Sequence, residues 1–168
     1  MAYLFVLVPL GLYLPAFIYE TYIAFRRLGK KGAGSAYLHG SWEITHTLLV
    51  VAVNYFIWLF ADIMPTVGKV IYPWLIIAGA AFLVRAAMYV WLFYYRRSAV
   101  TGWLDTAFAW LHIAIIAGLV LILLGVITTL ATHKYVINSQ FVPYMWPGLV
   151  LTFAVCAVPF FRTYTTRD

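Results

Sequence analysis

The sequence predicts an all-α fold, a polytopic membrane bundle of five transmembrane helices that forms a single membrane domain over residues 1–168. Two observations predict this fold class. Hydrophobic residues make up 65% of the chain and charged residues only 10%, whereas soluble domains contain about 25% charged residues. The apolar residues are also gathered in runs of about 20 or more, the helix length that crosses about 30 Å of hydrocarbon. The net charge of +6 does not indicate nucleic-acid binding, because such a chain lacks the solvated surface that phosphate contacts need.

Each expected helix is an apolar run that ends at a turn or charge signal. The five runs cover residues about 3–25, 42–63, 70–95, 103–130 and 141–161. The connections after the first four are a basic, glycine-rich segment at 26–35, a proline- and glycine-containing segment at 64–69, a second basic segment at 96–102 and a polar segment at 132–140.

Basic residues predict the orientation of this bundle. Eight Lys and Arg residues fall on one side, namely Arg26, Arg27, Lys30, Lys31, Arg96, Arg97, Arg162 and Arg167. Only Lys69 and Lys134 fall on the other side. Because cytoplasmic loops carry the excess of Lys and Arg, we expect the C-terminus in the cytoplasm and the N-terminus outside.

Ionisable residues are concentrated in the predicted cytoplasmic half of the spans. They are Glu20, Glu43, His46, Arg85, Asp105 and His112. Arg85 lies deepest in an apolar run, where a charge costs about 2.5 kcal/mol or more and usually faces a bundle interior or a water-filled cavity. We expect its partner to be Glu20, Glu43 or an anionic group of another subunit. These groups either form a proton pathway or a buried ion pair that only locks helices together.

Other members of this set have simpler interpretations. Glu43 and Asp105 lie near the start of a helix, where the helix dipole favours a carboxylate. His46 and His112 are on different spans, and two such imidazoles could ligate a haem iron axially. The alternative is that each histidine is only hydrogen-bonded near the interface. We predict no other metal site, and the single cysteine, Cys156, excludes an intrachain disulfide.

A series of motifs from Trp42 onward resembles one half of subunit II of the cytochrome bd-type quinol oxidases. The matching motifs are Trp42-Glu43 at the start of a helix, the intramembrane Arg85, the basic end at Arg96-Arg97, and Trp103-Leu104-Asp105. Near the start of the next helix the family has Tyr-x-Pro, and here Tyr72-Pro73-Trp74 has the proline directly after the tyrosine. The resemblance covers about 130 residues by order and spacing. The chain departs from the family at Thr45-His46, where the family has Asn-Glu, and at Tyr19-Glu20-Thr21-Tyr22, where the family has a glycine-flanked acidic motif. The family's subunit is also about twice as long as this chain of 168 residues.

The resemblance implies a subunit of a respiratory terminal oxidase in the electron-transport chain of a prokaryote, located as a multi-pass protein in the inner or plasma membrane. It implies a non-catalytic part of a quinol:oxygen oxidoreductase, one that binds no haem itself and packs against a haem-bearing subunit. Carried over residue by residue, a role in lining a cytoplasmic proton-uptake route falls to Glu43. The family's intramembrane Arg maps onto Arg85, and its first-helix acid loosely onto Glu20. Quinone, quinol or lipid would be neighbours, and the half length implies a second copy or a sister half-length chain.

Two other functions remain open from the sequence. The chain could be a b-type haem electron carrier or a quinone-reactive membrane anchor that uses His46 and His112. It could also be a small transport or assembly protein whose polar half forms a half-channel.

Overall fold

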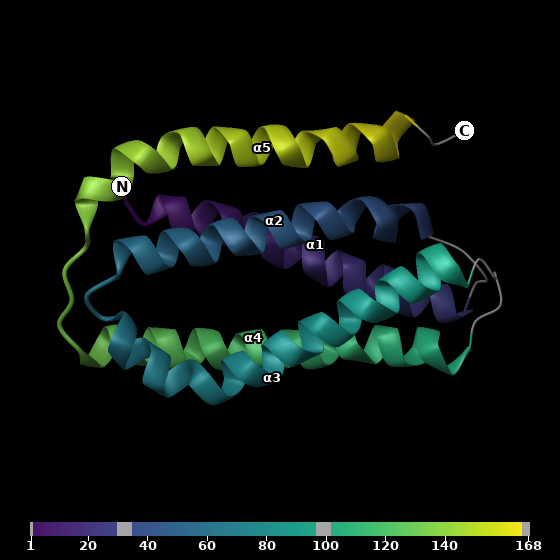
Figure 1. Cartoon of the computed structure of the whole chain (residues 1–168), viewed down its shortest axis with the longest axis horizontal. Helices are drawn as coiled ribbons and strands as arrows, with labels where there is room; N and C mark the ends of the chain where they lie inside the picture. Colours follow the sequence, from purple (N-terminus) through teal and green to yellow (C-terminus); the bar gives the residue numbers. More distant parts are fainter. Residues whose placement is uncertain (1, 30–34, 97–101, 166–168) are drawn as a thin grey trace. The chain divides into compact units, whose positions relative to one another are not determined.

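The computed structural model describes residues 2–29, 35–96 and 102–165, which form helices joined by short connections, with no strand among them. The helices are α1 (Leu4–Gly29), α2 (Ser35–Leu59), α3 (Met64–Val90), α4 (Trp103–Thr132) and α5 (Val142–Thr165) (Figure 1). One π-helical turn, Trp91–Tyr95, continues α3, and one 3₁₀ turn, Ser139–Phe141, leads into α5. The helices α1 to α4 are long and apolar enough to cross a membrane, whereas the described apolar part of α5, Val142–Ala157, is shorter. The all-helical fold class is confirmed, with four helices that could span a membrane.

The boundary between the second and third helices differs from the prediction. α2 ends at Leu59, before the expected end at 63, and α3 already begins at Met64. The expected connection at 64–69 is therefore wrong. Pro65 lies in the first turn of α3, where its missing N–H has no helical partner to lose and its fixed φ suits a helix. Pro65, which the sequence places in a connection, thus lies at the start of the helix.

The chain forms two compact units. The first unit comprises Met1–Glu20, Ala36–Ala61 and Val136–Asp168, and the second comprises Thr21–Ser35 and Asp62–Tyr135. The first unit therefore contains most of α1, α2 and α5, and the second contains the end of α1 with α3 and α4.

Aromatic side chains join the three helices of the first unit. The Tyr55 hydroxyl of α2 donates a hydrogen bond of 2.8 Å to the Met145 carbonyl of α5. The Phe5 ring of α1 contacts Tyr55 and Trp146 edge-on, with centroids 6.0 and 4.9 Å away. These edge-to-face contacts are the favoured geometry for aromatic pairs, and they place the core of this unit between α1, α2 and α5.

Glycines bring α3 and α4 close together in the second unit. A Cβ added to Gly118 would lie 3.2 Å from the Cβ of Ala78, and one added to Gly125 would lie 3.0 Å from Cγ2 of Ile71. Small residues at such contacts let helix backbones approach in a membrane, where packing replaces the hydrophobic driving force.

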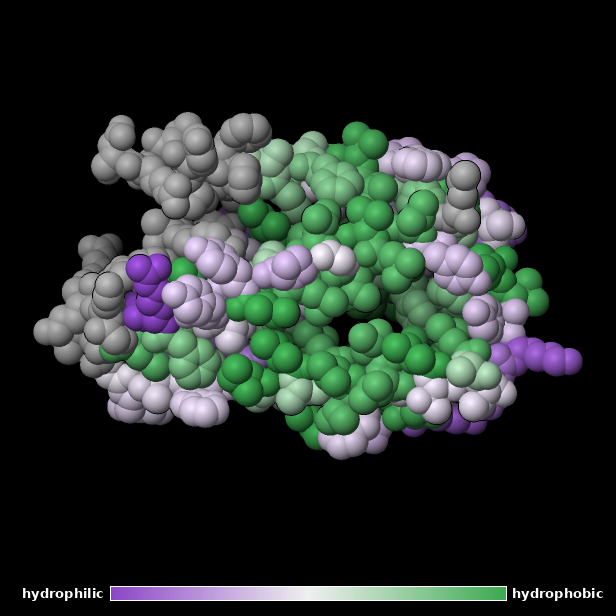
Figure 2. Space-filling model, turned by 180° about the vertical axis from the view of Figure 1, so that it is seen from behind, coloured by the Kyte–Doolittle hydropathy of each residue, from purple (hydrophilic) through white to green (hydrophobic). Residues whose placement is uncertain are grey.

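The outer faces of α3 and α4 are apolar. Their exposed residues include Ile76, Ile77, Leu83, Val84, Val120, Leu124 and Ile127. Hydrophobic side chains likewise cover most of the described surface on the face drawn in Figure 2. So much exposed apolar surface is unusual for a water-soluble monomer, and it fits helices that face lipid.

Candidate functional site

Arg85 and His112 form a fully buried pair between α3 and α4. Both residues are 0% exposed, and the Nε–H of Arg85 donates to Nε2 of His112 at 3.0 Å. Nδ1 of His112 lies 2.8 Å from the carbonyl oxygen of Phe108. Because a carbonyl only accepts, these partners assign the imidazole proton to Nδ1 and leave Nε2 as the acceptor for Arg85. The Phe108 ring, 5.9 Å from the guanidinium carbon, adds a cation–π contact.

This pair changes the interpretation of both residues. From the sequence we expect an anionic partner for Arg85. The structure shows a hydrogen bond from Arg85 to His112 on the neighbouring helix. Axial ligation of a haem through Nε2 of His112 would require this nitrogen to leave Arg85. Both ring nitrogens of His112 have a hydrogen-bonding role in the observed conformation.

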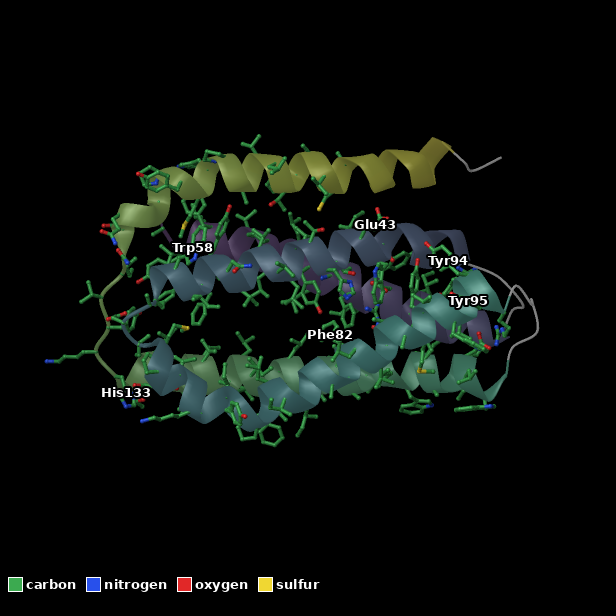
Figure 3. All side chains as sticks on the ribbon, viewed as in Figure 1. Glu43, Trp58, Phe82, Tyr94, Tyr95 and His133 are labelled. Carbon is green, nitrogen blue, oxygen red and sulfur yellow. The ribbon has the colours of Figure 1, made fainter. Side chains whose placement is uncertain are left out.

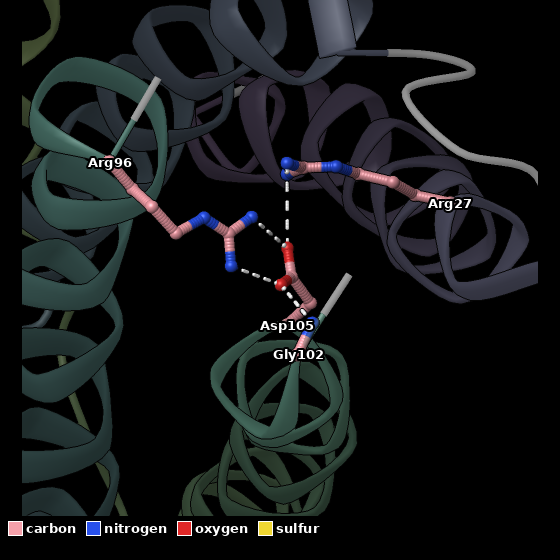
Figure 4. Close-up of polar contacts among 4 residues, drawn as sticks. All are labelled: Arg27, Arg96, Gly102 and Asp105. Carbon is pink, nitrogen blue, oxygen red and sulfur yellow. Dashed lines mark hydrogen bonds and ion pairs between the residues drawn. The ribbon is translucent and has the colours of Figure 1, made fainter. Parts of the chain in front are cut away.

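A second polar site, which we call the arginine–aspartate cluster, consists of Arg27, Arg96 and Asp105 (Figure 4). Both terminal nitrogens of Arg96 donate to the Asp105 carboxylate, with 3.0 Å between Nη2 and Oδ1. Nη2 of Arg27, at the end of α1, lies 3.4 Å from the same Oδ1. The backbone N–H of Gly102 donates to Oδ2 of Asp105 at 2.9 Å. Asp105 therefore joins the ends of α1 and α3 to the start of α4.

The cluster explains why Asp105 stands in a first helical turn. Asp105 lies in the first turn of α4, as expected, and there it accepts from the backbone N–H of Gly102. The sequence did not predict its arginine partners, because Arg27 and Arg96 were interpreted as loop charges. The signal that could have found Arg96 is its position opposite Asp105 across one short connection. The guanidinium of Arg27 also lies 4.5 Å from the ring centroid of Phe93, a favourable cation–π distance.

Glu20 and Thr45 form a buried polar pair in the first unit. Each is 1% exposed, and Oγ1 of Thr45 lies 3.1 Å from Oε2 of Glu20. The same hydroxyl lies 3.0 Å from the Ser41 carbonyl oxygen and 3.2 Å from that of Trp42. A hydroxyl has one proton but can also accept. The Thr45 hydroxyl can therefore donate to an ionised Glu20, or donate to the backbone and accept from a protonated Glu20.

His46 is held by its own helix. Its Nδ1 lies 2.8 Å from the Trp42 carbonyl oxygen, and its ring stacks on the Trp42 ring with centroids 3.9 Å apart. The half-buried His46 belongs to the first unit and His112 to the second.

Glu43 lies on an exposed polar face of α2 (Figure 3), eight residues after the helix begins at Ser35. The expected position of Glu43 at a helix start is therefore wrong. We define this polar face by Glu43, Thr47, Val50 and Asn54, whose spacing of four, three and four residues places them on one side of a helix. The Thr47 hydroxyl donates to the Glu43 carbonyl at 2.7 Å, and the Asn54 amide donates to the Val50 carbonyl at 2.8 Å. Within the described ranges, the Glu43 carboxylate itself has no hydrogen bond or ion pair. Glu43 is thus exposed on this chain and not buried in an ion pair.

Comparison with known proteins gives no relative from which a function could be inferred. No protein-family model, no curated protein and no solved structure matches this chain. The chemistry available for a functional assignment is therefore that of the two buried pairs, the arginine–aspartate cluster and the polar face of α2.

Proposed function

We propose that this chain is an integral membrane subunit of a respiratory terminal quinol oxidase complex. It supports a haem-bearing partner subunit and gives protons access from the cytoplasmic side, and it ligates no haem itself. The observation that carries the proposal is the exposed carboxylate of Glu43 directly after Trp42 on α2. In the family that the sequence resembles, a Trp–acidic pair helps line a proton-uptake route. The family's pair opens its helix, whereas Trp42 and Glu43 lie seven and eight residues after the start of α2.

The polar face of α2 is the evidence for a partner subunit. Asn54 lies eleven residues beyond Glu43 on the same exposed face, which is about 16 Å deeper along the helix. An amide in contact with lipid is unfavourable, and such residues usually bond to a neighbouring helix. A partner helix therefore covers this face in the complex.

The Glu20–Thr45 pair supports proton handling. A proton carrier in an apolar span needs a hydrogen-bonding partner in both of its protonation states, since an unsatisfied buried polar group is costly. The Thr45 hydroxyl supplies both roles, because backbone carbonyls of Ser41 and Trp42 can take its proton. Glu43 would receive protons at the membrane surface, and Glu20 would hold them within the bundle.

The buried Arg85–His112 pair supports a structural role in preference to the haem-carrier alternative. Nε2 of His112 already accepts from Arg85, so haem ligation would break a buried hydrogen bond to a charged group. In this proposal the pair joins α3 and α4, and the haems belong to the partner. The proposal includes five spans with the C-terminus in the cytoplasm of a prokaryote, and a second copy or sister chain that completes the family's full length.

The test is purification of the tagged chain with its native partners in mild detergent, followed by a reduced-minus-oxidised spectrum and quinol-driven oxygen consumption. Glu43→Gln should slow turnover and leave the haem spectrum unchanged, because it removes a carboxylate that can carry a proton and no ligand of iron. Glu43→Asp should keep part of the activity, since it retains a carboxylate with a shorter reach. Asp62→Asn is the control. Asp62 is an exposed carboxylate in the connection that follows α2, beyond the helix end opposite to Glu43, so its loss should leave turnover unchanged.

Two outcomes would overturn the proposal. A complex without haem or without quinol oxidation would exclude an oxidase subunit. A haem band carried by this chain alone, and lost in His46→Ala or His112→Ala, would replace the proposal with the b-type haem carrier.

A further inference from the structure

An apolar groove lies on the surface of the second unit. It encloses about 280 Å³ and is lined by Ala87, Met88, Trp91, Leu92 and Leu104. Among the five described lining residues, only Trp91 carries a side-chain N–H donor, and none is charged. A ligand in this groove would therefore be held by apolar contact.

Residues that line the groove adjoin residues of the arginine–aspartate cluster along the chain. Leu104 immediately precedes Asp105 in α4. The backbone N–H of Arg96 donates to the carbonyl of Trp91 at 2.9 Å. Arg96 therefore lies one helical turn after Trp91, which lines the groove. One elongated molecule could therefore contact both the groove and the cluster.

The cluster has an excess of positive charge. Two guanidinium groups surround the single carboxylate of Asp105, which leaves a net charge of about +1 on these three groups. The Nε atoms of Arg27 and Arg96 are buried and find no hydrogen-bond acceptor among the residues described. An anionic group bound beside the cluster would balance the positive charge that Asp105 does not neutralise.

We propose that the groove and the cluster together form a binding site for an anionic phospholipid, with an acyl chain in the groove and the phosphate beside Arg96. The exposed rings of Trp91, Tyr95 and Trp103 flank this end of the unit, and such rings sit at the headgroup level of a bilayer. Basic pockets between membrane helices are known to select anionic headgroups. The inference needs only that α3 and α4 lie in a membrane, and it is independent of the oxidase proposal.

The test compares retention of phosphatidylglycerol and phosphatidylcholine with identical acyl chains on the whole chain, measured by native mass spectrometry. We expect phosphatidylglycerol to be retained about fivefold more, the effect of one positive charge near the surface. Arg96→Gln should reduce this ratio to about one, because the cluster then carries no net charge. Lys69→Gln, which removes an exposed cation from the first turns of α3, should leave the ratio unchanged. Excess inorganic phosphate should not displace the lipid, because it cannot occupy the groove.

A second variant tests the groove without touching an ion pair. Leu104→Trp should lower the retention of both lipids several-fold by filling the groove, whereas Leu124→Trp, at an exposed position of the same helix outside the groove, should not. Equal retention of the two lipids by the wild type would overturn the proposal, as would Leu104→Trp behaving like Leu124→Trp. Displacement of the lipid by phosphate alone would assign the site to a free anion. If Arg96→Gln does not fold, the comparison of the two tryptophan variants decides.

Discussion

Arg85 shows how a single buried charge is accommodated. A guanidinium in an apolar span is stabilised only by partners, and the structure supplies the acceptor nitrogen of His112 and the face of Phe108. The sequence predicted that Arg85 and His112 lie at depth, because depth follows from position in an apolar run. It could not predict their pairing across 27 residues of sequence, because that depends on how α3 and α4 are rotated about their own axes.

We predict that Arg85→Leu lowers the apparent unfolding temperature and the yield in detergent more than Arg85→Lys does. Leucine leaves Nε2 of His112 buried without a donor, which costs about 1–3 kcal/mol. Lysine keeps the charge and a donor, although it loses the planar fork of the guanidinium. The measurement is a thermal melt followed by size-exclusion chromatography, with Val84→Leu at the exposed neighbouring position as control. If Arg85→Leu behaves like Val84→Leu, Arg85 has no structurally important partner.

At the scale of the helices, the apolar runs predicted that the helices exist but not the residues at which they begin and end. Five runs gave five helices, because a long apolar segment must satisfy its backbone internally in a membrane. The ends depend on local chemistry that hydropathy ignores: Pro65 begins α3, and the Gly102 amide bonded to Asp105 begins α4. The contact between α3 and α4 also depends on single positions, since Gly118 and Gly79 look alike in the sequence but only Gly118 faces the neighbouring helix.

The two glycines give a matched prediction. Gly118→Leu should lower the apparent unfolding temperature, because its Cβ alone would lie 3.2 Å from the Cβ of Ala78 and its remaining atoms would push α3 away. Gly79→Leu should have no effect or stabilise slightly, because its Cβ meets nothing within 4 Å and a glycine within a helix costs about 0.5–1 kcal/mol relative to alanine. Thermal melts of the two variants, measured side by side, test the packing. Equal melting behaviour would mean that α3 and α4 do not approach at Gly118.

At the scale of the whole molecule, composition predicted the class and charge counting predicted an orientation. The class follows from the apolar length of the helices, and four of them meet that requirement. The arginine–aspartate cluster was not predicted, because counting Arg27 and Arg96 as loop charges treats them as solvated. In the structure the Arg27 side chain is 8% exposed and contacts Asp105. The same two residues therefore contribute to the charge bias and to the packing of helix ends.

The orientation predicts that positions 102 and 136 are on opposite sides of the membrane. Gly102 precedes α4, and Val136 follows it and is 74% exposed. In a Cys156→Ala background, an impermeant maleimide should label cysteine at 136 in intact cells and cysteine at 102 only after the membrane is opened, because the basic connections remain in the cytoplasm. The reverse pattern would invert the chain and remove cytoplasmic proton access through Glu43 and Glu20. Labelling of both positions from one side would mean that α4 does not cross the membrane, although its 30 residues could span about 45 Å.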